Sequence, residues 1–129
     1  MCSYHDASNF NSDQMIALTV GVGLNNEAYE AQMRGDHKIA LEKYKQALEI
    51  KVKAYGENSL HVCISLSGLC DAYLELNDLE NATLQANRML SIAQYITNPE
   101  QIRIAQEILV DCEKLSKKRK KLASVQKNK

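Results

Sequence analysis

The stretch MRGDHKIALEKYKQALEI, residues 33–50, contains the clearest structural pattern of this 129-residue chain. It passes from the end of one predicted helix through a Gly35-Asp36 turn into another helix over about 37–54. In that second helix the inward residues recur at helical spacing, with charged residues on the opposite face; they are Ile39, Ala40, Tyr44, Ala47, Leu48 and Lys51. A tight turn between two such helices predicts an antiparallel hairpin.

The same pattern returns 42 residues later, in ELNDLENATLQANRMLSI, residues 75–92. Asn77-Asp78 takes the place of Gly35-Asp36. The other matches at this shift are Ala40 with Ala82, Leu48 with Leu90 and Ile50 with Ile92. A small residue at the same distance from each turn predicts close helix crossing, so we expect Ala82 to be buried. The chain therefore contains one helical hairpin twice.

The composition favours helix throughout. Apolar residues make up 45% of the chain, with one Pro, five Gly and no Trp, and Ala, Leu, Glu, Lys and Gln dominate. The length fits one domain or a piece of a longer repeat array. No run reaches the roughly 18 apolar residues of a membrane span, and residues 1–10 lack the basic and apolar regions of a signal peptide.

Further helices are predicted on both sides of the central pattern. The first runs over about 13–34, capped by Ser12 or Asp13, and Gly21 and Gly23 mark a kink or a close helix contact. Gly56 ends the second helix in a left-handed conformation, and Asn58 or Ser59 caps the next.

The third helix covers about 60–76 and the fourth ends near Tyr95. The inward residues of the third are Val62, Leu66, Leu69, Cys70 and Tyr73. Asn98 then caps a fifth helix that runs from about Pro99 into KLSKKRKK, residues 114–121.

These elements predict an all-α domain of about five helices over residues 13–116. Hairpin 1 covers about 13–55, hairpin 2 about 59–96, and a capping helix begins at about 99. Residues 1–12 are expected to be a flexible leader and residues 117–129 a basic tail.

The second hairpin resembles the tetratricopeptide repeat, whose pattern is W-x2-L-G-x2-Y followed by A-x3-F. Here it appears as Leu66-x2-Leu69-Cys70-x2-Tyr73 followed by Ala82, and hairpin 1 supplies Ala40-x3-Tyr44. Glu27, Ala31 and Ala86 depart from the pattern. The long period is similar to that of kinesin light chain repeats. The resemblance implies a right-handed superhelix of antiparallel hairpins, an α-solenoid; the alternative is a generic bundle of unrelated helices.

The fifth helix matches the first helix of a repeat at a shift of 39. Ala105, Ile108, Leu109 and Cys112 then take the inward positions. A terminal cap needs a polar outer face, and the candidates for it are Gln101, Arg103, Gln106, Glu107, Glu113 and Lys114.

The resemblance also implies a concave groove lined by the first helix of each hairpin. Its expected lining is Asn25, Tyr29, Gln32 and Met33 from hairpin 1, and Ile64, Ser67, Asp71, Leu74 and Glu75 from hairpin 2. No Lys or Arg stands among them, which excludes the family's clamp for terminal carboxylates. Asp71 and Glu75, with Glu27 and Glu30 nearby, favour a neutral or basic protein or peptide partner.

Charge is unevenly distributed. All 16 acidic residues and eight of the 16 basic residues lie in 1–113, while the other eight basic residues lie in 114–129. The tail is centred on Lys117, Lys118, Arg119, Lys120 and Lys121. It fits a solvated helix end, a nuclear-localisation or nucleic-acid patch, or a contact with an acidic surface. No aromatic residue lies among the Lys and Arg residues of the tail, which argues against stacking on nucleic-acid bases.

No catalytic or metal constellation is visible. His5, His37 and His61 stand apart from any nucleophile pattern, and GVG at 21–23 lacks the strand and third glycine of a nucleotide loop. Cys2, Cys63, Cys70 and Cys112 form no CxxC pair. They fit reduced core thiols better than a metal site. The chain is therefore interpreted as a non-enzyme without a cofactor or membrane partner.

The resulting hypothesis is an adaptor or scaffold, in the cytoplasm or the nucleus, that binds a short peptide or partner helix in the groove. One alternative is a unit or fragment that assembles through its open repeat ends, including with its own copies. The other is a nucleic-acid or nuclear-targeting role for the basic tail.

Overall fold

The computed structural model describes residues 11–127, and all regular structure within that range is helical. The prediction of an all-α chain is therefore confirmed. The elements are α1 (Ser12–Ile16), the π-helical η2 (Ala17–Gly21), α2 (Val22–Met33), α3 (His37–Tyr55), α4 (Leu60–Glu75), α5 (Leu79–Tyr95) and α6 (Pro99–Lys127). The expected leader falls largely outside the described residues, but Asn11 and Ser12 already belong to the first helix and its cap.

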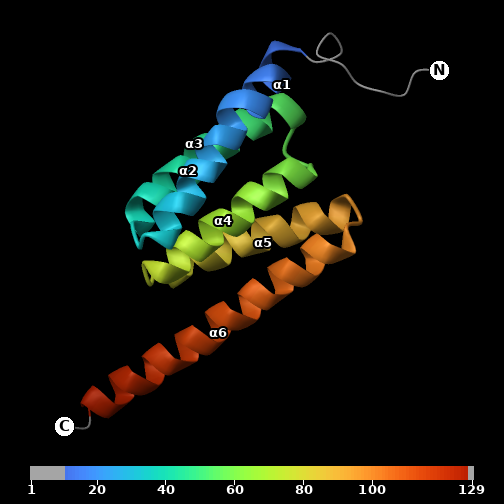
Figure 1. The fold of residues 1–129 in the computed structure, drawn as a ribbon. Coiled ribbons are helices and arrows are strands. Elements are labelled where there is room, and N and C mark those ends of the chain that lie inside the picture. Colours follow the sequence, from blue (N-terminus) through green and yellow to red (C-terminus); the bar gives the residue numbers. More distant parts are fainter. Residues whose placement is uncertain (1–10, 128–129) are drawn as a thin grey trace.

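The helices stack in chain order (Figure 1). The main contacts join α2 to α3, α3 to α4, α4 to α5 and α5 to α6, and smaller ones join α2 to α4 and α4 to α6. The first helices of successive hairpins therefore approach one another along one side. The sequence predicts the groove on this side.

Three turns share one backbone geometry. Asp36 N–H donates to the Ala31 carbonyl at 2.8 Å, Asp78 N–H to Tyr73 at 2.9 Å, and Asn98 N–H to Ala93 at 3.0 Å. The residue before each donor has a positive φ: 86° at Gly35, 60° at Asn77 and 50° at Thr97. These are Schellman turns, in which the left-handed residue satisfies the last helix carbonyls. Two of them are the turns quoted above, and the third joins α5 to α6.

The connection between α3 and α4 is built differently. Gly56 has a φ of 83°, and Ser59 caps α4 by accepting a hydrogen bond from Val62 N–H. Arg88 of α5 donates to both carboxylate oxygens of Glu57 at 2.6 Å. A bidentate pair of this kind is directional, so it fixes the longer connection against the second hairpin.

The predicted inward faces are mostly correct. Ala40 and Ala82 are fully buried, and the five inward residues predicted for α4 are all buried. Ala105, Ile108 and Cys112 are buried on α6, and Leu109 packs partly buried against this core. The repeat alignment therefore identified which face of each helix enters the core.

Some positions differ from the predictions. Ile39 is 50% exposed, because the buried stripe of α3 is centred on Ala40, Tyr44 and Ala47. Gln101 is buried rather than on the outer face of α6. The first cap is Asn11, whose side chain accepts from Gln14 N–H in a capping box.

The glycines of the first helix have different roles. Gly21 is buried at the end of η2, and a β-carbon there would lie 3.5 Å from Cγ2 of Ile50. This agrees with the expected close helix contact. Gly23 has open space where its side chain would be.

The last helix does not stop at the expected domain boundary. α6 continues unbroken through 116 and 117 to Lys127. Arg119, assigned to the tail, donates to the Asn77 carbonyl oxygen at 2.8 Å. The basic residues thus extend the capping helix, and Arg119 contacts the second hairpin.

Candidate functional site

A pocket of about 370 Å³ lies between α2 and α4. α2 contributes Asn25, Asn26 and Tyr29, α4 contributes Ile64, Ser67, Gly68 and Asp71, and α3 contributes Tyr44. The first helices of the two hairpins form its walls, and the Tyr44 side chain of the intervening helix α3 also lines it. This pocket is the candidate binding site, and we refer to it and the flanking side chains of α2, α4 and α6 as the groove.

Tyr44 reaches the groove because Gly68 leaves room for its ring. A β-carbon at Gly68 would lie 2.4 Å from Cε1 of Tyr44, a distance at which something must move. The Tyr44 hydroxyl donates to Oε1 of Gln32 at 3.0 Å. Burial raises the pKa of the Tyr44 hydroxyl, with smaller contributions from Asp71 and Tyr29. The Tyr44 hydroxyl is therefore neutral, and its hydrogen bond to Gln32 fixes the side chain in the pocket.

Two polar groups of the pocket, the Asn25 amide and the Asp71 carboxyl, are candidates for ligand contact. Oδ1 of Asn25 is buried with no hydrogen-bond partner among the described residues, and such an atom favours a donor. Asp71 is accessible at the rim, yet the surrounding walls displace enough water for desolvation to raise the pKa of its carboxyl, with further contributions from Glu75 and Asp111. A bound cation would relieve this clustering of negative charge.

Five of the nine residues predicted to line the groove meet in this pocket: Asn25, Tyr29, Ile64, Ser67 and Asp71. The other four lie outside it. Gln32 is engaged by Tyr44, Leu74 packs partly against the core, Met33 is exposed, and Glu75 lies 3.8 Å from Nε2 of His37. Glu27 forms an ion pair with Lys43 at 3.1 Å, so it is not a free carboxylate of the groove.

Sequence reasoning missed three lining residues, Asn26, Tyr44 and Gly68. Gly68 carried a usable signal, because a glycine inside a strongly apolar helix often marks a close approach. Tyr44 was assigned to the core, and it is indeed buried. The pocket shows that its ring also forms part of a surface.

The surface continues onto α6. A second hollow there is lined by Arg103, Gln106, Glu107, Val110, Asp111 and Lys114. Arg103 forms ion pairs with Glu100 and Glu107 within the helix. The carboxyl of Asp111 contributes to the raised pKa of Asp71. The carboxylates of α4 and α6 therefore form one negatively charged area.

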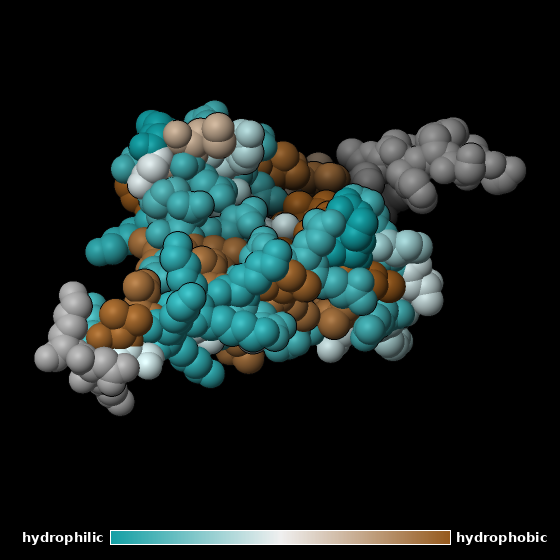
Figure 2. All heavy atoms as spheres, turned by 90° about the horizontal axis from the view of Figure 1, so that it is seen from below, coloured by the Kyte–Doolittle hydropathy of each residue, from teal (hydrophilic) through white to brown (hydrophobic). Residues whose placement is uncertain are grey.

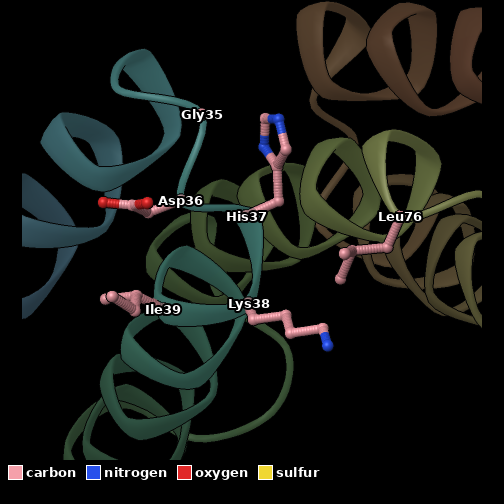
Figure 3. Close-up of a pocket in the computed structure, with 6 residues that line it drawn as sticks. All are labelled: Gly35, Asp36, His37, Lys38, Ile39 and Leu76. Atoms are coloured by element: carbon pink, nitrogen blue, oxygen red, sulfur yellow. The ribbon is translucent and has the colours of Figure 1, made fainter.

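A further pocket lies at the turn between α2 and α3 (Figure 3). It is lined by Gly35, Asp36, His37, Lys38, Ile39 and Leu76. The drawn side chains of Asp36, His37 and Lys38 point in different directions. They do not converge on one point, as a nucleophile, a base and an orienting group must.

The cysteine thiols of the described residues and His61 are packed against other parts of the protein. Cys63, Cys70 and Cys112 are buried free thiols, and Cys2 lies outside the described residues. Burial, with Asp71 and Cys112, raises the pKa of Cys70 to about 12. His61 stacks on Tyr55 with ring centroids 3.8 Å apart; burial first, then Lys51, lowers its pKa.

Comparison with known proteins finds no match: no protein-family model, curated protein or solved structure is similar to this chain. Among residues 11–127, no helix combines the length and the apolar character needed to cross a membrane.

Proposed function

We propose that this chain is a tetratricopeptide-like α-solenoid adaptor that binds a short basic, amphipathic peptide or helix in the groove. The stacking of helices in chain order supports this architecture, as do the smaller contacts of α4 with α2 and α6. The shared turns of the two hairpins support it further. A surface built across successive hairpins is how solenoid proteins bind their partners.

One observation carries the proposal. Residues selected by repeat register alone, Asn25 and Tyr29 on α2 with Ile64, Ser67 and Asp71 on α4, line a single pocket. A register error of one residue would have moved them to other faces of their helices. The agreement therefore favours a groove at this place over an incidental hollow.

The chemistry of the pocket defines the ligand. Exposed Tyr29 and Ile64 offer apolar contact, and the Asn25 amide oxygen lacks a donor. Asp71 lies near two other carboxylates. A peptide with an apolar side chain flanked by Lys or Arg matches all three features. Its apolar side chain would contact Tyr29 and Ile64, its cations would face Asp71, and its N–H groups would donate to Asn25. Charge complementarity of this kind mainly speeds association and decreases with salt.

The test is a titration with fluorescent amphipathic peptides of about 15 residues that differ only in carrying Lys, Gln or Glu on the polar face. We expect the Lys peptide to bind best. The double substitution Asp71→Lys with Glu75→Lys should weaken it at least about ten-fold, which corresponds to about 1.4 kcal/mol.

The matched control is Glu42→Lys with Glu49→Lys, which makes the same charge change at exposed positions of α3. This control should bind the Lys peptide like the original chain. Equal weakening in both variants would show that peptide binding depends only on the net charge of the protein and not on the groove. Unchanged binding after reversal of Asp71 and Glu75 would show that the groove is not the site.

A further inference from the structure

The end of α6 is basic and extends beyond the rest of the molecule. Arg119 still contacts the α4–α5 turn through Asn77, whereas residues 120–126 are exposed. Figure 1 shows this red segment projecting past the other helices. At 1.5 Å per residue, the part from Arg119 to Lys127 is about 12 Å long. We call residues 117–127 the basic helix end.

One face of the basic helix end combines cations with apolar side chains. Lys118, Lys121, Leu122 and Val125 are spaced i, i+3, i+4 and i+7, so they share a face. Leu122 and Val125 are 56% and 51% exposed. Figure 2 shows hydrophobic atoms beside the grey C-terminal atoms at the left. This is the composition for which the groove is suited.

The groove offers the complementary arrangement. Asp71 and Glu75 are four residues apart on α4, and Lys118 and Lys121 are three residues apart on α6, so each pair spans about one helical turn. Ile64 lies on the same face of α4 as the two carboxylates. Tyr29 adds an exposed ring from α2. All 16 acidic residues precede residue 114, and half of the basic ones follow residue 113.

The basic helix end cannot enter the groove of its own chain. α6 is one unbroken helix from Pro99 to Lys127, and residues 100–127 contain neither Gly nor Pro. A turn back onto α4 would require the helix to break, with loss of its backbone hydrogen bonds. A second molecule can present this segment without any such change.

We propose that the basic helix end of one copy docks in the groove of a second copy, with Lys118 and Lys121 facing Asp71 and Glu75. This inference rests on the proposed function of the groove. The contact is heterologous, because each copy contributes a different surface. It leaves one groove and one helix end free, so the assembly extends into chains unless it closes into a ring.

Sedimentation of the full chain tests the assembly. At about 50 mM salt the mean mass should rise with concentration beyond that of a dimer, and at about 500 mM salt it should return to that of the monomer. A mass that equals the monomer at every concentration at low salt would overturn the inference.

Two charge-reversed variants make the test specific. The groove variant carries Asp71→Lys with Glu75→Lys, and the helix-end variant carries Lys118→Glu with Lys121→Glu. Each alone should remain monomeric, because its groove and helix end then carry like charges. An equimolar mixture should assemble, because the intact helix end of one variant meets the intact groove of the other and the two reversed surfaces also carry opposite charges. Absence of mixed assemblies would contradict head-to-tail docking.

The control for the helix end is Lys117→Glu with Lys120→Glu, an equal charge change on another face of α6, and it should assemble like the original chain. Loss of assembly in this control would indicate a charge effect without a docked face. A monomeric chain that instead bound duplex DNA through Lys118 and Lys121 would assign the helix end to nucleic acid and overturn the inference.

The groove itself is tested separately. The helix-end variant retains an intact groove and should bind the Lys peptide described above. Peptide binding without self-assembly would overturn this inference and leave the proposed function standing. Failure of the Lys peptide to bind would overturn the proposed function.

Discussion

The ring of Tyr44 lies against the backbone of Gly68, where a β-carbon would be 2.4, 2.6 and 2.7 Å from three ring carbons. The contact joins α3 to α4 across the two hairpins, and the same ring lines the groove. The stability of the hairpin stack and the shape of the pocket therefore depend on one glycine.

Gly68→Ala should lower the free energy of unfolding by about 1–3 kcal/mol through overpacking, despite the better helix propensity of alanine. Gly23→Ala, at a helix position with open space, should raise stability by about 0.5–1 kcal/mol. Urea denaturation of both variants measures the difference. Equal effects of the two substitutions would contradict the close Tyr44–Gly68 contact.

The three Schellman turns differ in the backbone strain of their left-handed residue. Thr97 is a β-branched residue held at a φ of 50°, where Gly35 at 86° is unstrained. Thr97→Gly should therefore stabilise the protein by about 1 kcal/mol, and Gly35→Ala should destabilise it by about 1–2 kcal/mol. Thermal unfolding followed by circular dichroism gives both values, and a lower melting temperature for Thr97→Gly would contradict the strain argument.

The Arg88–Glu57 pair should make stability depend on pH. The hydrogen bonds from Arg88 are the main cause that lowers the pKa of Glu57. The stabilisation is therefore present above the unfolded-state pKa of about 4.5 and is lost as pH falls through the lower folded-state pKa.

Because both side chains are more than a third exposed, solvent screening limits the pair to about 0.5–1 kcal/mol at pH 7. Arg88→Met should lose this amount, and its stability curve should converge with that of the original chain in acid. Arg103→Met removes pairs that lie within α6 and should have a smaller effect. A stability difference for Arg88→Met that stays constant from pH 7 to pH 3 would exclude the linkage.

The buried thiols should be unreactive while the protein is folded. Cys70 is fully buried and its pKa is raised to about 12, so little thiolate forms at pH 8. In a Cys2→Ser variant, labelling with an aromatic disulfide reagent should follow the rate at which the fold opens, and urea should accelerate it. Rapid labelling of Cys70 in native buffer would contradict this burial.

Much of the fold was predictable because its signals are local. The helix boundaries follow from Ser59, Asn98 and the turn residues, whose caps involve only nearby backbone. Ile39 was placed wrongly because apolar character alone does not show the centre of a buried stripe. The fifth helix was predicted to run into residues 114–121, and its last turns to Lys127 were missed, because few apolar residues follow Leu115 and exposed Lys residues are compatible with helix or coil.

The groove was predictable only in part. Repeat register brought Asn25, Tyr29 and Asp71 to one place, since alternate helices of a stack face the same side. The packing of Tyr44 onto Gly68 depends on the distance between two helices, which no spacing along one helix expresses. Similarly, the Glu57–Arg88 pair joins residues 31 positions apart, and neither residue belongs to a recognisable pattern.

The stacking of the helices also affects how the chain reaches its native state. The substantial contacts join helices that are adjacent or next but one in the chain, so contact order is low. Low contact order is associated with folding in microseconds to milliseconds. For the α-solenoid proposed above, stability is expected to be a sum of units and their interfaces. Hydrogen exchange should therefore be fastest in the outermost helices and slowest in α4, which contacts α2, α3, α5 and α6.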